Sequence, residues 1–383
     1  MTPAAHVATA IGILDQVLQG APAEQALLRW SRASRFAGSG DRAAVRDLVF
    51  QALRRRNSLA SLGGALSGRG LMIGLSRDNG QDPDTVFTGE GYAPAPLTPA
   101  ERVPGTGTVP DIPDWIVPLW RASLGAEADR IADAMRDRAP VWLRVNALRG
   151  DTAEAVAMLA TDGIEVQPSP QLATALRVSR GERRVNASRA YREGLVELQD
   201  LSPQLACAAL PLAEGDRVLD YCAGGGGKSL ALAAQQPRLR LFAHDADPSR
   251  MSDLPVRARR AGARIDPVSR PQGHYQLVIA DVPCSGTGTW RRTPDAKWRF
   301  DAAALDRLLT IQARILSQVA PLVAPDGYLC YMTCSFLRPE NDARISDFLA
   351  ENPSFSQVQR HLWTSLSASD GFFLSVLKNN PKL

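Results

Sequence analysis

The chain has 383 residues, of which 45% are hydrophobic and 22% charged, and its formal net charge at pH 7 is +4. This balance predicts a globular protein of two or three domains, and the mild positive charge is by itself weak evidence for a nucleic-acid partner. Without an 18-residue apolar run or a signal peptide we expect a cytoplasmic protein with no membrane span, and five cysteines without a C-x-x-C spacing predict no metal site.

The first 90 residues are predicted to form a helical domain. Val7, Ile11, Leu14 and Leu18 recur at helical spacing, and a second apolar series follows the capping residues of Gly38-Ser39-Gly40-Asp41. Residues 91–113 contain six prolines, which break any regular pattern and predict a linker. We therefore place a domain boundary in this segment.

Residues 114–195 mix helical and strand-like patterns. Residues 129–138 and 152–160 are predicted to be helices, the second capped by Asp151 or Thr152, and 141–145 is predicted to be a strand. These elements predict a small α/β module.

From residue 196 to 383, strands and helices alternate, which favours a mostly parallel sheet with helices on both faces. The expected strands cover 218–221, 239–244, 276–280, 328–332 and 372–377. The expected helices cover 228–235, 248–261, 302–323 and 341–350.

A glycine loop, YCAGGGGKS, joins the first of these strands to the helix that follows. Glycines allow close backbone approach to a ligand, and a helix N-terminus favours negative charge. A nucleoside-triphosphate loop would need glycine where Cys222 stands, so that interpretation is disfavoured. Asp245, about 20 residues further on, could bind the ribose of a dinucleotide or of S-adenosylmethionine. The loop alone does not distinguish these two ligands.

Two cysteines are predicted to follow the ends of two strands, Cys284 after 277–280 and Cys334 after 328–332. Ligands of open α/β sheets bind beyond these ends. A thiolate that adds to carbon 6 of cytosine makes carbon 5 nucleophilic enough to accept a methyl group. A second thiol could remove the carbon-5 proton afterwards, and an acid at Asp281 could act near ring nitrogen 3. Core burial is the alternative, and we adopt it for Cys330 and Cys207.

The motifs resemble those of the RNA 5-methylcytosine methyltransferases of the RsmB/Fmu (Nol/Nop/Sun) family. The matching stretches are LDYCAGGGGKS, HDADPSRM, ADVPCSGTGTWRRTPDAKW, YMTCSFLRPEN and the terminal DGFF, with VWLRVN and LVELQD upstream. The resemblance covers roughly residues 115–383, while residues 1–90 resemble a NusB-like RNA-binding domain. It implies a Rossmann-like class I methyltransferase domain with a seven-stranded, mostly parallel sheet, and S-adenosylmethionine as cofactor.

The resemblance also implies residue roles. Cys334 would be the nucleophile, Cys284 would assist breakdown of the adduct, and Asp281 would contact the cytosine and lie near the cofactor. The expected cofactor residues are Cys222, Ala223, Gly224, Gly225, Gly226, Gly227, Lys228, Asp245, Arg250, Ser269 and Asp281. The residues expected to reach RNA phosphate are Arg291, Arg292 and Lys297.

Two positions depart from the family pattern. Gly225 stands where the family's loop usually carries proline, which predicts a more flexible loop. Ser269 stands where the family usually has an aspartate near the adenine, which predicts a weaker contact with the cofactor.

The expected function is methylation of a cytosine in RNA, most naturally ribosomal RNA, by a monomer. A transfer-RNA methyltransferase with the same chemistry is an alternative. A DNA cytosine-5 methyltransferase would use Cys284 as its nucleophile instead. A different class is a non-catalytic RNA-binding assembly factor that retains the fold, and the intact cysteine pair argues against it.

Overall fold

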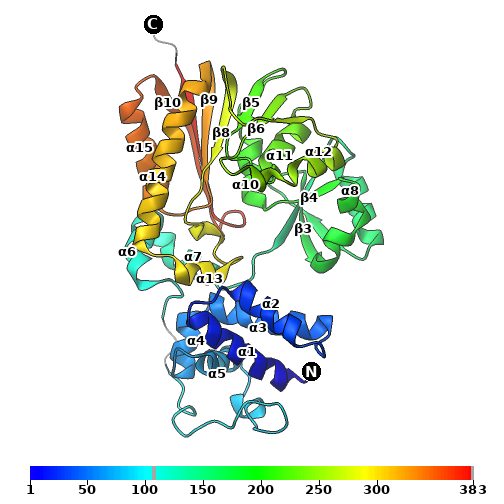
Figure 1. The fold of residues 1–383 in the computed structure, drawn as a ribbon, viewed down its shortest axis with the longest axis vertical. Helices are drawn as coiled ribbons and strands as arrows, with labels where there is room; N and C mark the ends of the chain where they lie inside the picture. The colour runs from blue at the N-terminus through cyan, green and yellow to red at the C-terminus, as the bar shows by residue number, and fades with distance from the viewer. Residues whose placement is uncertain (106–108, 381–383) are drawn as a thin grey trace. The chain divides into compact units, whose positions relative to one another are not determined.

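The computed structural model describes residues 1–105 and 109–380, which form two compact units (Figure 1). Unit 1 contains residues 1–138 together with the inserted segment 290–301, and unit 2 contains 139–289 and the chain from residue 302 onward. The proline-rich segment that suggested a domain boundary thus lies inside unit 1, which continues to Arg138.

Unit 1 is built from helices. They are α1 (Pro3–Leu18), α2 (Ala23–Ala33), α3 (Ser39–Arg54), α4 (Arg56–Gly63), α5 (Gly68–Asp78), α6 (Val117–Leu124), α7 (Ala128–Ala134) and α13 (Pro294–Arg299). Leu14, Val49 and Leu71 are fully buried in its apolar core. Helices α4 and α5 pack with their backbones close together. Glycine at position 74 permits this approach, because a Cβ atom there would lie 2.1 Å from the carbonyl oxygen of Leu59.

The inserted helix α13 is bonded to the helices of unit 1. The indole Nε1 of Trp298 donates to the carbonyl of Leu53 at 2.7 Å, and Asp295 accepts from the backbone N–H of Ala23 at 3.3 Å. Trp298 also packs against the core of unit 1. These contacts explain why a segment that interrupts unit 2 in sequence belongs to unit 1 in space.

Unit 2 begins with a small antiparallel sheet in the order β2-β3-β1-β4. Its strands are β1 (Val141–Val145), β2 (Glu165–Pro168), β3 (Ala175–Arg180) and β4 (Val196–Leu198), accompanied by α8 (Thr152–Thr161) and α9 (Arg189–Arg192). Strand β1 has the bounds expected from the sequence. Asp151 and Glu154 form a reciprocal capping box at the start of α8.

The second sheet of unit 2 has seven strands in the order β10-β11-β9-β8-β5-β6-β7. They are β5 (Arg217–Asp220), β6 (Arg240–Ala243), β7 (Ile265–Pro267), β8 (Tyr275–Asp281), β9 (Val323–Thr333), β10 (Phe355–Trp363) and β11 (Phe372–Asn379). Strands β5 to β9 pair in parallel, and β11 is antiparallel to both β9 and β10. The predicted fold class, a mostly parallel seven-stranded α/β sheet, is confirmed.

Helices cover both faces of this sheet (Figure 1). They are α10 (Leu201–Ala208), α11 (Gly227–Gln235), α12 (Leu254–Ala261), α14 (Ala302–Val319) and α15 (Asp342–Glu351). Alternate residues of a strand point to opposite faces. Leu277 and Ile279 of β8 therefore join the apolar cluster with α10 and α11, whereas Val278 and Ala280 join the cluster with α14 and α15.

Some bounds differ from the expected ones. The predicted helix 248–261 is a short 3-10 turn, Pro248–Met251, followed by α12. Strand β10 was not predicted, because most of its side chains are exposed at the sheet edge and polar residues interrupt any apolar alternation. Among the helices in the described part of the chain, none combines the length and apolarity that a membrane span needs.

Candidate active site

Cys284 and Cys334 lie next to each other although 50 residues separate them, and their Sγ atoms are 3.3 Å apart. Strands β8 and β9 are parallel neighbours, with Asp281 in register with Met332. Each cysteine follows the carboxyl end of one of these strands, so the sheet brings both thiols to the same edge. Both side chains are half-buried.

The two thiols have opposite electrostatic surroundings. The hydrogen bond with Cys284 lowers the pKa of Cys334 below its usual value, against the opposing effect of burial, and Thr289 Oγ1, 3.9 Å from the sulfur, lowers it further. The same thiol–thiol contact, together with burial, raises the pKa of Cys284. Of the two, Cys334 is therefore the thiol that ionises first.

A buried carboxylate, Glu340, holds the two cysteine loops together. Its side chain accepts hydrogen bonds from the hydroxyls of Ser285 and Ser335, the residues that directly follow the two cysteines. It also accepts from the backbone N–H of Ser285 at 2.8 Å and from Gln312 Nε2 at 3.0 Å. Glu340 stands in the YMTCSFLRPEN stretch, but no local pattern in the sequence marks it as part of the site.

The glycine loop joins β5 to α11. Gly224 and Gly226 have left-handed backbone, with φ of 49° and 77°, which glycine adopts without strain. The backbone N–H of Gly224 donates to Asp245 at 3.0 Å, and Arg250 lies 3.3 Å from the same carboxylate oxygen. The loop, the acid at the end of β6 and Arg250 thus form one cluster.

This cluster fits the cofactor that the resemblance implies. A Cβ atom at Gly227 would meet its nearest neighbour, Gln199 Nε2, at 4.0 Å, so the start of α11 is not crowded by a clash and its backbone N–H groups favour an electronegative ligand. Asp245 is the carboxylate that would accept the ribose hydroxyls. Burial raises the pKa of Cys222, so its side chain is a neutral thiol at neutral pH. Ser269 is exposed, two residues beyond the end of β7.

Lys228 and Asp281 connect the glycine loop to the cysteine pair through an ion pair. Burial alone would lower the pKa of Lys228, but Asp281 and Asp220 raise it above its usual value. Lys228 therefore carries its charge at neutral pH. The ion pair directs the Asp281 carboxylate toward the loop, at the end of the strand that leads to Cys284.

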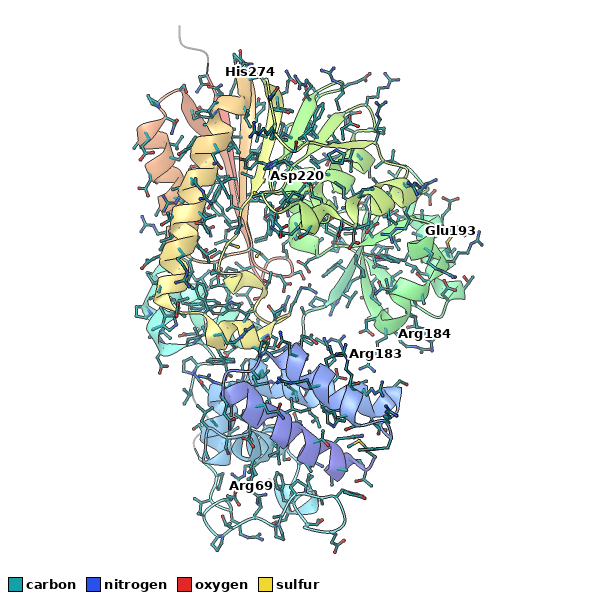
Figure 2. All side chains as sticks on the ribbon, viewed as in Figure 1. Arg69, Arg183, Arg184, Glu193, Asp220 and His274 are labelled. Carbon is teal, nitrogen blue, oxygen red and sulfur yellow. The ribbon has the colours of Figure 1, made fainter. Side chains whose placement is uncertain are left out.

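Asp220, labelled in Figure 2, is a second buried acid that was not predicted as a site residue from the sequence. It ends β5 and accepts from Ser229 Oγ at 2.7 Å through Oδ2, whereas Oδ1 has no hydrogen-bond partner within the described chain. Burial raises the pKa of Asp220 to about 6. The strand order of the sheet reverses between β5 and β8. Ligands of open α/β sheets bind in the crevice at this reversal, beside the strand end where Asp220 lies.

The three residues expected to reach RNA phosphate lie in the inserted segment of unit 1. Arg292 is exposed, whereas Arg291 and Lys297 are buried, and Lys297 is only 4% exposed. The Lys297 ammonium donates to the backbone carbonyls of Arg54 and Asp111. A phosphate contact requires an accessible cation, so the structure favours Arg292 and disfavours the other two.

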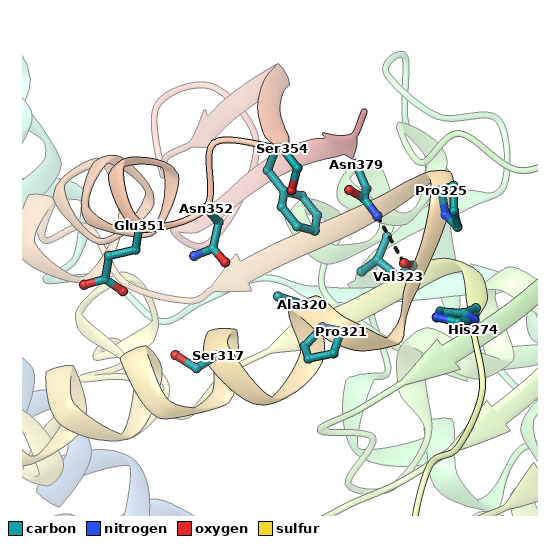
Figure 3. Close-up of a pocket in the computed structure, with 11 residues that line it drawn as sticks. His274, Ser317, Ala320, Pro321, Val323, Pro325, Glu351, Asn352, Ser354 and Asn379 are labelled. Carbon is teal, nitrogen blue, oxygen red and sulfur yellow. Dashed lines mark hydrogen bonds between the residues drawn. The ribbon is translucent and has the colours of Figure 1, made fainter. Parts of the chain in front are cut away.

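Two further observations concern alternative sites. Within residues 1–105 and 109–380, no group of three or more metal-ligating side chains gathers. A cavity of about 550 Å³, lined by His274, Ser317 and Asn379 among others, lies at the amino ends of β8 and β9 (Figure 3). In it, the Asn379 amide donates to the carbonyl of Val323 at 3.2 Å. The cysteines follow the opposite ends of these strands, so this cavity is separate from the candidate active site.

The sequence matches two family descriptions. Residues 207–378 match the 16S rRNA methyltransferase RsmB/F family, and residues 112–186 match the ferredoxin-like domain of RsmF/B-like methyltransferases. The chain is 35% identical over 298 residues to ribosomal RNA small subunit methyltransferase B of Xylella fastidiosa strain Temecula1, covering 72% of this chain and 69% of that relative. The corresponding protein of Xanthomonas campestris is 34% identical, with 69% and 66% covered. The chain spans about two thirds of the length of these relatives.

Solved structures share the fold. The crystal structure of PH0851 has a TM-score of 0.75 at 21% identity, covering 98% of this chain and 99% of that one. The structure of NSun6 from Pyrococcus horikoshii with SFG has a TM-score of 0.63 at 14% identity, with 70% and 99% covered. The sequence relatives confirm the family that the motifs predict, and the solved structures share its fold. The chain belongs to the RsmB/F family of S-adenosylmethionine-dependent rRNA methyltransferases.

Proposed function

We propose that this protein methylates carbon 5 of a cytosine in ribosomal RNA, with Cys334 as the nucleophile. The observation that carries the proposal is the pair of thiols 3.3 Å apart at the carboxyl ends of β8 and β9, connected to the glycine loop by Asp281 and Lys228. Ribosomal RNA is the substrate named for the relatives.

The chemistry follows from the properties of the two thiols. Bound S-adenosylmethionine supplies the methyl group as an electrophile. The Cys334 thiolate adds to carbon 6 of a cytosine turned out of its stack, and carbon 5 becomes nucleophilic. Asp281 lies at the strand end where it would contact the cytosine edge. After methylation, the carbon-5 proton leaves to a base, the carbon–sulfur bond breaks, and Cys334 is regenerated as a thiolate.

The thiol–thiol contact supports a division of labour between the cysteines. The hydrogen bond with Cys334 is the largest cause that raises the pKa of Cys284. Once Cys334 is bonded to carbon, it no longer carries the charge that opposes ionisation of Cys284. A larger fraction of Cys284 is then in the thiolate form, which can accept the carbon-5 proton, and this is the role we assign to it.

The experiment compares Cys284→Ser and Cys334→Ser with total RNA and S-adenosylmethionine. We expect covalent RNA–protein adducts to accumulate on Cys284→Ser and none on Cys334→Ser, detected on a denaturing gel. The reverse pattern would assign the nucleophile to Cys284. Adducts on neither variant, with no transfer of labelled methyl by the wild type, would favour a non-catalytic assembly factor.

The RNA target requires a separate experiment. Bisulfite sequencing of RNA from cells lacking this gene should show one ribosomal RNA cytosine that loses methylation and regains it on complementation. Loss of methylation at a transfer RNA cytosine instead would assign transfer RNA as the substrate and would leave the proposed chemistry unchanged.

A further inference from the structure

The glycine loop receives hydrogen bonds from two arginines outside it. Arg257, on α12, donates through Nη1 to the carbonyl of Gly225, and Arg144, on β1, donates through Nη1 to the carbonyl of Gly227 at 2.9 Å. Hydrogen bonds from a charged donor are stronger than neutral ones. The loop backbone is therefore held from two different elements of unit 2.

Both arginines are hydrogen-bonded to side chains in or directly after β4. Arg257 Nη2 donates to Glu197 Oε2 at 3.1 Å, and Arg144 donates to the side chain of Gln199. Glu197 is 1% exposed and also pairs with Arg260. Arg257 and Arg260 thus balance the charge of this buried carboxylate, and the ion pair with Glu197 keeps the guanidinium of Arg257 in one position.

The space around Gly225 explains why a glycine stands there. Gly225, unlike its neighbours Gly224 and Gly226, does not have left-handed backbone, so its conformation does not require glycine. A Cβ atom at position 225 would instead lie 2.7 Å from Arg257 Nη1. Because position 225 has no side chain, the guanidinium of Arg257 can reach the carbonyl of Gly225.

We propose that Arg257, anchored by Glu197, is a positioning residue that holds the glycine loop in the conformation that binds S-adenosylmethionine. This inference rests on the proposed assignment of the loop as the cofactor site. Arg257 acts through the loop backbone, so its loss should affect cofactor binding much more than the chemical step. Gly225 and Arg257 should behave as a coupled pair, because a side chain at 225 displaces the guanidinium.

The test measures the Kd of S-adenosylmethionine by calorimetry on the full chain, and its KM and kcat with total RNA from cells lacking this gene. Arg257→Ala should raise Kd and KM about tenfold and change kcat less than about twofold, since it removes a charge-assisted hydrogen bond from the binding conformation. Arg257→Lys should lie between, because one ammonium cannot reach both Gly225 and Glu197. Arg259→Ala, an exposed arginine on the same helix, is the matched control and should leave all three constants unchanged.

Gly225→Ala provides an independent variant that leaves Glu197 and Arg257 present. It should raise Kd to a similar extent, and the double variant Gly225→Ala/Arg257→Ala should bind no more weakly than Arg257→Ala. Effects of the two single changes that simply add, or a folded Arg257→Ala with wild-type Kd, would overturn the positioning role.

Asp245→Ala separates this inference from the proposed cofactor site. A Kd raised by Asp245→Ala but not by Arg257→Ala overturns the positioning role alone. A Kd unaffected by both Asp245→Ala and Arg257→Ala places the cofactor away from the loop and overturns both assignments.

Discussion

Ser285 and Ser335 lie side by side with their hydroxyl oxygens 3.1 Å apart, and each directly follows one of the two cysteines. Both hydroxyls donate to the Glu340 carboxylate, which has no exposed surface. The distance between the two thiols thus depends on a third side chain that touches neither sulfur. Glu340 therefore holds the loop after β8 against the loop after β9, and this arrangement places the two cysteine thiols side by side.

Replacing this acid tests the arrangement. Glu340→Ala would leave the N–H of Ser285 without its acceptor, at a cost of about 1–3 kcal/mol, and would leave the Gln312 amide only the carbonyl of Pro283. We expect a lower melting temperature and loss of methyl transfer, with little change in the Kd of S-adenosylmethionine, because the glycine loop is held by other residues. Glu351→Gln, an exposed glutamate on α15, is the control. Full methyl transfer by a folded Glu340→Ala protein would contradict the positioning of the cysteines by Glu340.

The ionisation of Cys334 predicts a pH dependence. The contact with Cys284 lowers the pKa of Cys334, so its reaction with iodoacetamide should reach half-maximal rate below pH 9.0, the usual thiol value. Cys284→Ala removes this contact, and the midpoint should move to higher pH. Mass spectrometry of the labelled Cys334 peptide between about pH 6 and pH 10 measures both profiles. A midpoint that does not move on removing Cys284 would show that the thiol–thiol contact does not control this pKa.

Asp220 predicts a pH dependence of stability. Its folded pKa, about 6, lies above the usual value of 3.8, so the folded state holds this proton more tightly than the unfolded state does. The contribution to the free energy of unfolding is therefore present below about pH 4 and is lost as the pH rises toward 6. Asp220→Asn retains an acceptor for Ser229 and should match the wild type near pH 4, then exceed it by up to roughly 3 kcal/mol at pH 7.

Urea unfolding of the two proteins at several pH values measures this difference. Asp266→Asn, a change at an exposed aspartate on β7, is the control for loss of one carboxylate. A difference between Asp220→Asn and the wild type that stays constant from pH 4 to pH 7 would mean that Asp220 does not titrate in this range.

The inserted segment of unit 1 predicts different roles for two of its basic residues. Arg292→Ala should weaken RNA binding and reduce the slope of log K against log salt by about 1, as expected for one lost phosphate contact. Lys297→Met should leave this slope unchanged, because the Lys297 ammonium is occupied by two backbone carbonyls. Filter binding with 16S-type ribosomal RNA at several salt concentrations measures the slopes. A reduced slope for a folded Lys297→Met protein would return Lys297 to the phosphate-binding residues.

The sequence by itself determined the local features of this protein. The alternation of strand and helix, the glycine loop before α11 and the strand 141–145 depend on side-chain periodicity and turn residues close together in the chain. The two cysteines were recognisable because each follows an apolar strand in a polar turn. Strand β10 was not recognisable, since an exposed edge strand has little apolar alternation to reveal it.

Only the tertiary structure decided which of these features meet. Parallel pairing of β8 with β9 brings Cys284 to 3.3 Å from Cys334, and no local pattern contains that distance. The same holds for the contacts of Glu340 with two serines and of Arg257 with Gly225. Lys297 is a basic residue in a family motif, which predicted an RNA contact, but in the folded chain it is buried and bonded to two backbone carbonyls. Burial and partnership depend on what other segments place around a side chain, and that is a property of the packed chain rather than of any window of its sequence.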